Sequence, residues 1–209
     1  MRLLVVGASG LVGSHVLRLA LADDRIDQVV APVRRALPVH SKLLAPVVDF
    51  DVLPEEAPWW TVDAVVCALG TTLRTAGSRE AFYRVDHDYP LAAARLARTR
   101  GTPTFVLNSA IGADIASHFF YNRVKGEVER DLAALGFRSL TYVRPGLIGG
   151  NRQEFRTGER LASFVLRLLG PALPRRWRIN PAERIAAAMV AAAVTGASGV
   201  HIVASEALI

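Results

Sequence analysis

The amino-acid sequence predicts a doubly wound α/β fold, in which helices cover both faces of a mainly parallel β-sheet. Three observations lead to this prediction. Short apolar segments alternate with helical patterns along most of the 209 residues. The first segment, RLLVVGA, has the continuous apolar character of a strand buried on both faces. A glycine-rich turn, GASGLVG, follows this strand and leads into a helical pattern.

The first half of the chain contains four of the expected strands. Short apolar runs predict strands at residues 2–8, 27–33, 44–50 and 63–69. The segment from 10 to 22 is expected to be the helix that follows the first strand. Strands separated by helices in this way indicate a parallel sheet.

The second half continues the alternation. A long helix is expected at 89–99, a fifth strand at 104–110 and a further helix at 120–135. A sixth strand is expected at 139–146 and a late strand at 200–205. The apolar segment IAAAMVAAAVTGA, which precedes the late strand, is alanine-rich and indicates a packed helix.

Residues 147–182 are richer in Arg, Gly and Pro and lack the alternation. We expect one domain over 1–209, with 147–182 as a small C-terminal cap over the carboxyl ends of the strands, where such sheets bind ligands. Within the cap, 159–179 has apolar residues at helical spacing. This helix is expected to cover the cleft, and Trp177 could line the substrate pocket. The alternative is an arginine-rimmed apolar surface for a lipid-like substrate, a membrane face or a partner.

Charge and cysteine content limit the classes of partner. The net charge is +6, yet no long Lys/Arg run occurs, so an anionic small ligand is a simpler explanation than nucleic acid. The single cysteine, Cys67, lies in the apolar run AVVCAL and is expected to be a buried, inert thiol. No uncharged stretch approaches the roughly 20 residues of a spanning helix, and the N-terminal apolar run is too short for a signal peptide. A reducing, cytoplasmic location is expected.

The turn after the first strand has the spacing of a dinucleotide-binding loop. Gly7 permits the tight turn, Gly10 lets backbone N–H groups approach a pyrophosphate, and Gly13 lets the helix pack closely on the strand. The strand–turn–helix context makes the motif specific. The alternative is an ordinary βα turn. The residues assigned to this part of the cofactor site are Gly7, Ser9, Gly10, Leu11, Val12 and Gly13.

The end of the second strand indicates which dinucleotide binds. An Asp or Glu at this position selects NAD, but QVVAPVRRAL has none and instead presents Arg34 and Arg35. A guanidinium can hold a phosphate through two hydrogen bonds, so NADP is favoured and NAD is left as the second choice. The alternative is a solvated arginine pair. Asp49, at the end of the third strand, is placed to meet the adenine edge or to cap a turn.

Tyr121 and Lys125, in FFYNRVKGEVE, lie four positions apart and therefore share one face of the expected helix. An ammonium group near a phenol favours its charged form, so this pair is a candidate for acid–base chemistry. Ser109 ends the fifth strand, twelve residues before Tyr121. The alternative is a half-buried tyrosine and a solvated lysine.

The order of glycine loop, Ser and Tyr-x-x-x-Lys resembles the short-chain dehydrogenase/reductase family. The segments VRRAL, VVDFDVL, ALGTT, RVDHDYP, GADIASHFFYNRVKGEVE and RPGLIGGNRQEFR resemble its atypical subgroup, which contains the human Tat-interacting tumour-suppressor oxidoreductase and bacterial relatives. The resemblance covers nearly the whole chain. It implies that Tyr121 is the general acid, that Lys125 binds the nicotinamide ribose, and that Ser109 holds the substrate oxygen.

The resemblance also implies cofactor contacts from two further loops. These contacts are Leu69, Gly70, Thr71 and Thr72 after the fourth strand, and Pro145 and Gly146 after the sixth. The chain departs from the family at Asp86, where many members have an asparagine that supports a proton relay. Asp86 or His87 could substitute, although His87 is expected to be a surface histidine at a helix start.

These observations predict an NADP(H)-dependent oxidoreductase that reduces a small carbonyl substrate, with no metal ligand assigned. The first alternative is a protein that binds NADPH as a redox sensor with little turnover, because one fold supports many functions. The second is an epimerase acting on nucleotide sugars, against which the short chain argues. Oligomeric state is left open.

Overall fold

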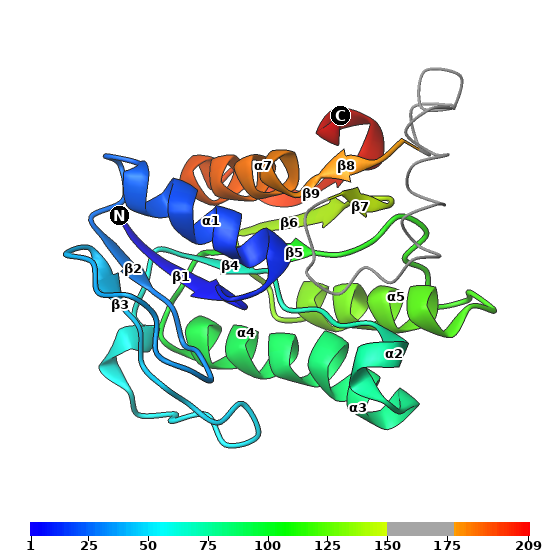
Figure 1. Ribbon diagram of the computed structural model, residues 1–209, viewed down its shortest axis with the longest axis horizontal. Coiled ribbons are helices and arrows are strands. Elements are labelled where there is room, and N and C mark those ends of the chain that lie inside the picture. Colours follow the sequence, from blue (N-terminus) through cyan, green and yellow to red (C-terminus); the bar gives the residue numbers. More distant parts are fainter. Residues whose placement is uncertain (150–177) are drawn as a thin grey trace.

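The computed structural model describes residues 1–149 and 178–209. Within them, a seven-stranded sheet has the order β3-β2-β1-β4-β5-β6-β9, and every pairing is parallel (Figure 1). The strands are β1 (Arg2–Val6), β2 (Gln28–Val30), β3 (Leu43–Leu44), β4 (Ala64–Cys67), β5 (Thr104–Asn108), β6 (Ser139–Arg144) and β9 (Gly199–Ala204). The doubly wound parallel sheet expected from the sequence is confirmed.

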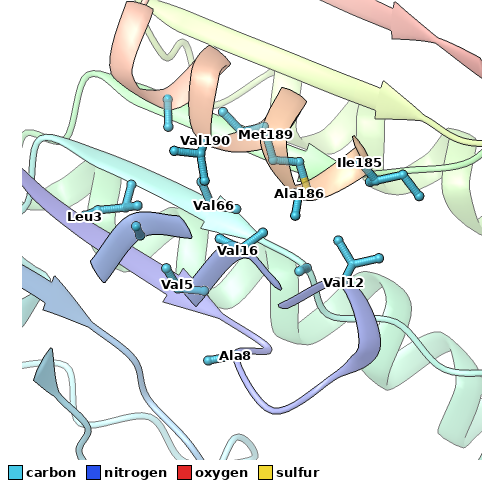
Figure 2. Close-up of a cluster of buried hydrophobic side chains, with 14 of the residues drawn as sticks. Leu3, Val5, Ala8, Val12, Val16, Val66, Ile185, Ala186, Met189 and Val190 are labelled. Atoms are coloured by element: carbon cyan, nitrogen blue, oxygen red, sulfur yellow. The ribbon is translucent and has the colours of Figure 1, made fainter. Parts of the chain in front are cut away.

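Two pairs of helices sandwich the sheet. Helices α1 (Leu11–Ala22) and α7 (Ala182–Thr195) cover one face, and α4 (Tyr89–Thr99) and α5 (Phe120–Ala133) cover the other (Figure 1). Figure 2 shows the core on the α1/α7 side, where Val16 and Met189 meet strand residues such as Val5 and Val66. Because both faces are covered, β1 is apolar and fully buried at four consecutive positions.

The second and third strands are shorter than expected. β2 ends at Val30 and β3 at Leu44, and an isolated bridge between Val33 and Val47 continues their pairing. Pro32 follows β2 and Pro46 follows β3. A proline has no N–H to donate to a ladder, so regular pairing stops near it.

Several short helices lie between β4 and α4, where the sequence analysis assigned no element. Helix α2 (Leu73–Ala76) is capped by Thr72, whose hydroxyl accepts from the Thr75 N–H at 3.1 Å. Helix α3 (Arg79–Tyr83) is capped in the same way by Ser78. A π-helical turn, η2 (Arg84–Asp88), joins α3 to α4.

A 3₁₀ turn, η1 (Pro58–Trp60), places two neighbouring tryptophans in a packed corner before β4. Trp59 and Trp60 are both buried. The indole N–H of Trp60 donates to the Pro54 carbonyl at 2.8 Å, which satisfies the polar atom of a buried ring.

Most of the expected cap at 147–182, including Trp177 and residues 159–177 of the expected helix, lies outside the described residues. Its described ends pair as two short strands, β7 (Ile148–Gly149) and β8 (Asn180–Pro181). The fully buried Asn180 accepts from the Gly146 N–H at 2.7 Å and donates to the Ser205 carbonyl at 2.9 Å. The loop after β6 is therefore tied to the final 3₁₀ turn, η4 (Ser205–Leu208).

Candidate active site

The glycine loop between β1 and α1 is built for close approach. Gly7 has φ +87°, and a Cβ there would lie 2.8 Å from the backbone N of Leu69. A Cβ on Gly13 would lie 2.0 Å from the Gly7 carbonyl oxygen, so only glycine lets α1 pack on the turn. A Cβ on Gly10 would meet only that same oxygen, at 3.3 Å. Each of the three glycines thus meets a different steric requirement, as the motif predicts.

The N-terminus of α1 fits a pyrophosphate. Gly10 is the N-cap, and no side chain of the described residues caps the first turn. The backbone N–H groups of this first turn and the positive end of the α1 dipole are therefore free to meet an anion. Ser9 and Gly10 are exposed and Leu11 is half-buried. Val12 is buried in the core, so its backbone alone could face a ligand.

The two arginines after β2 are exposed, as a phosphate clamp at the open edge of the site requires. Within the described part of the chain, neither Arg34 nor Arg35 makes a hydrogen bond or ion pair, so both guanidinium groups are available. Asp49 is exposed, and its Oδ1 accepts from the Asp51 N–H at 2.9 Å. Asp49 therefore takes the turn-capping role that the sequence left as one of two options.

The loop after β4 lies against the glycine loop, since Leu69 touches the Gly7 position. The Thr71 N–H donates to Asp86 Oδ2 at 2.8 Å, and the Thr72 hydroxyl is used to cap α2. Gly70 is exposed. These contacts fix the backbone of the loop and leave Gly70 open toward a ligand.

Lys125 is buried, with 2% of its surface exposed. Its Nζ lies 2.8 Å from Asp86 Oδ1 and 3.4 Å from the Asn108 carbonyl oxygen. Burial opposes the charge on Lys125, but the interactions with Asp86, Tyr121 and Cys67 together exceed that effect, so the pKa of Lys125 is raised. The lysine is thus a charged group held inside the site, which excludes the alternative of a solvated surface lysine.

Tyr121 lies one turn before Lys125 on α5. Its side chain is 39% exposed, and its ring centroid lies 5.7 Å from that of Phe82 on α3. The ring is therefore packed on one side while the phenol stays accessible. The structure brings the expected pair to one face of α5 and adds Asp86 to it.

Ser109 is buried at the end of β5, and its hydroxyl donates to Glu129 Oε1 at 2.5 Å. The same carboxylate binds Arg144 from β6 through two hydrogen bonds, one of them from Nε at 3.0 Å. The proton of Ser109 is thus engaged by Glu129, while its oxygen can still accept a hydrogen bond. Glu129 was not among the residues predicted from the sequence, although it lies four residues after Lys125 and so shares its face of α5.

Replacing Glu129 with Ala should strongly destabilise the protein. The change leaves Arg144, with 28% of its side chain exposed, without its counter-charge, and removes the partner of Ser109. Breaking a buried pair costs about 3–5 kcal/mol, and partial exposure of Arg144 favours the lower end. Urea denaturation measures the loss. Glu183→Ala, which removes an ion pair with Arg18 that is more than half exposed, should cost less than about 1 kcal/mol. Equal losses would contradict the role of Glu129.

His87 is buried, so the expectation of a surface histidine is wrong. Its ring nitrogens lie 2.8 Å from Asp88 Oδ1 and 3.0 Å from Asp131 Oδ2, and the ring stacks on Tyr83 with centroids 4.4 Å apart. The reason is the π-helical turn. Its wider spacing rotates residues relative to an α-helix, so Asp86 and His87, neighbours in sequence, are both buried.

Gly126 is a second residue that the sequence analysis missed. A Cβ there would lie 2.4 Å from the carbonyl carbon of Asp114 and from the backbone N of Ile115. The loop after β5 can therefore pack directly on α5. This loop is also held by the residue that follows β6, because the Ile111 N–H donates to the Pro145 carbonyl at 2.8 Å. Pro145 is buried and Gly146 is half-buried.

Comparison with known proteins gives a consistent result. A family model described as "NAD dependent epimerase/dehydratase family" matches residues 3–114. The chain is 38% identical to "Protein HTATIP2" of Rattus norvegicus, with 93% of this chain and 82% of the relative covered. It is 36% identical to "Protein fmp52, mitochondrial" of Emericella nidulans, with 79% and 75% covered.

A solved structure, "MoeE5 in complex with UDP-glucose and NAD", has the same fold, with a TM-score of 0.74 at 18% identity over 97% of this chain and 75% of that one. None of the helices in residues 1–149 and 178–209 is long and apolar enough to cross a membrane. The fungal relative is named as mitochondrial, so the comparisons do not support the cytoplasmic location expected from the sequence.

Proposed function

Since the chain belongs to the NAD dependent epimerase/dehydratase family, we propose that it is an NADP(H)-dependent oxidoreductase of the atypical short-chain dehydrogenase/reductase type. Its substrate is a small carbonyl compound. The observation that carries the proposal is the buried ammonium of Lys125, held by Asp86 one helical turn from the accessible phenol of Tyr121. This arrangement suits a proton donor beside a bound dinucleotide.

Each residue has a separate task in this proposal. Tyr121 gives its proton to the carbonyl oxygen, and the Lys125 charge stabilises the phenolate that remains. Lys125 also donates hydrogen bonds to the ribose next to the nicotinamide. Ser109 donates to the substrate oxygen once its hydroxyl turns away from Glu129. Bound NADPH supplies the hydride.

A turnover screen tests the proposal. The purified protein is incubated with NADPH and with panels of aldehydes, ketones and quinones, and the loss of NADPH absorbance is followed. We expect turnover of at least one compound, with loss of that turnover in Tyr121→Phe. Binding of NADPH without turnover of any compound would favour the sensor described below.

Arg34 and Arg35 should make NADPH bind more tightly than NADH. Hydrogen bonds to charged groups contribute roughly 1.5–3 kcal/mol, which corresponds to about a tenfold or greater preference. Fluorescence titration measures both affinities. The Arg34→Ala/Arg35→Ala double variant should lose the preference, whereas Arg95→Ala/Arg98→Ala, which removes two exposed arginines from α4, should keep it. Equal affinities in the wild-type protein would refute the phosphate clamp.

A redox sensor that binds NADPH with little turnover is the second candidate. The observation that favours it is the hydrogen bond from Ser109 to Glu129, which engages the proton that a substrate oxygen would need. If the protein is a sensor, Lys125→Ala weakens NADPH binding while Tyr121→Phe changes nothing measurable.

A further inference from the structure

We propose that Asp86 is a positioning residue that joins the Lys125 ammonium to the cofactor loop after β4 and keeps that ammonium charged. The role of Asp86 in cofactor binding rests on the proposed function, whereas the contact between Asp86 and Lys125 is independent of it. Asp86 is 1% exposed. One of its oxygens lies 2.8 Å from Lys125 Nζ and the other accepts from the Thr71 N–H at 2.8 Å. A single carboxylate therefore contacts a group on α5 and a backbone amide of the loop.

Only a carboxylate meets both requirements. Lys125 and Thr71 each present a donor, so the side chain between them needs two acceptor atoms. An asparagine has one acceptor oxygen, and its NH₂ group would face either the ammonium or the amide. Either the Thr71 N–H would then lose its acceptor, which carries a large cost, or the Lys125 ammonium would lose its counter-charge. This distinguishes Asp86 from an asparagine at the same position.

The π-helical turn is what brings Asp86 to this place. Residues 84–88 are wound more widely than an α-helix and connect α3 to α4 without a break. Such turns shift the direction of side chains and are frequent at functional sites.

The charges around Lys125 show why Asp86 decides its state. The ionisable groups that act on Lys125 are Asp86 from η2, Tyr121 from its own helix and Cys67 from β4. Burial raises the pKa of Cys67 to about 12, so this thiol stays neutral. Among these groups, Asp86 supplies the negative charge that offsets the burial of the ammonium. Removing that charge disfavours the ammonium, so Lys125 should lose its proton at lower pH.

The chain allows a direct test because Lys42 and Lys125 are its two lysines. Protein labelled with ¹⁵N at the lysine Nζ is titrated by NMR without cofactor, and the two signals are assigned with Lys42→Arg. In the wild-type protein, the midpoint of Lys125 should lie above the ordinary value for a lysine side chain. In Asp86→Asn, its midpoint should fall by at least about one pH unit, while that of Lys42 does not move.

Asp88→Asn is the matched control, because Asp88 lies on the same π-helical turn but contacts His87. It should leave the Lys125 midpoint unchanged. A midpoint that stays in place in Asp86→Asn, or that moves equally in Asp88→Asn, would overturn the proposal. If Asp86→Asn does not fold, the wild-type titration decides alone, because a Lys125 midpoint below the ordinary value for a lysine side chain would also overturn the proposal.

NADPH titration of the same variants separates this inference from the proposed function. Asp86→Asn should bind NADPH at least about tenfold more weakly at alkaline pH, where its lysine is neutral, and Asp88→Asn should bind as the wild-type protein does. If the wild-type protein binds no NADPH, the proposed function fails while the lysine titration still tests Asp86. If NADPH binds but Asp86→Asn has wild-type affinity at every pH, the positioning role fails by itself.

Discussion

Tyr121→Phe should lower kcat by about 10²–10⁴-fold while leaving NADPH affinity unchanged. General acid catalysis typically accounts for an effect of this size, and the phenol contributes little to holding the cofactor. Phenylalanine keeps the ring that packs 5.7 Å from Phe82 and removes only the hydroxyl, so stability should hardly change. Steady-state rates on a substrate found by the screen, together with NADPH titration, measure both quantities.

Two further sets of variants complete this experiment. Lys125→Ala should lose both rate and affinity, and Lys125→Arg should not restore them, because a planar guanidinium does not fit the buried place of a compact ammonium beside Asp86. Tyr89→Phe is the control, since that phenol donates to Asp51 outside the site. It should leave kcat unchanged. If Tyr121→Phe turns over substrate at the wild-type rate, Tyr121 is not the general acid.

Gly10→Val should abolish the binding of either dinucleotide while the protein still folds. The backbone of Gly10, with φ −79° and ψ 173°, suits any residue. A Cβ there approaches only the Gly7 carbonyl oxygen, at 3.3 Å, so the added side chain would project into the space in front of the α1 N-terminus. That space is where the pyrophosphate must lie. Calorimetric titration with NADPH and NADH checks the loss, and circular dichroism checks the fold.

Gly13→Ala provides the contrast, because its Cβ would lie 2.0 Å from the Gly7 carbonyl oxygen and the backbone would have to move. Overpacking of this kind typically costs about 1–3 kcal/mol, so this variant should lose stability first. The two variants thus separate damage to the cofactor site from damage to the fold. A folded Gly10→Val protein with wild-type NADPH affinity would show that the phosphate loop is misplaced.

The sequence by itself determined the features that depend on local pattern. Continuous apolar runs identified the strands that are buried on both faces, and the spacing of Gly7, Gly10 and Gly13 identified the loop that follows the first strand. The four-residue spacing of Tyr121 and Lys125 placed them on one face of α5, because helical periodicity is a local property. The same periodicity also places Glu129 on this face of α5, four residues after Lys125.

Only the tertiary structure decided which side chains from different elements meet. The pairing of Asp86 with Lys125, and of Ser109 with Glu129 and Arg144, joins residues from separate elements. No periodicity encodes such contacts. The π-helical turn that buries both Asp86 and His87 is likewise set by packing against α5, since its intrinsic stability is low. Buried charges must find partners wherever the fold places them, and that requirement appears only when the elements are packed together.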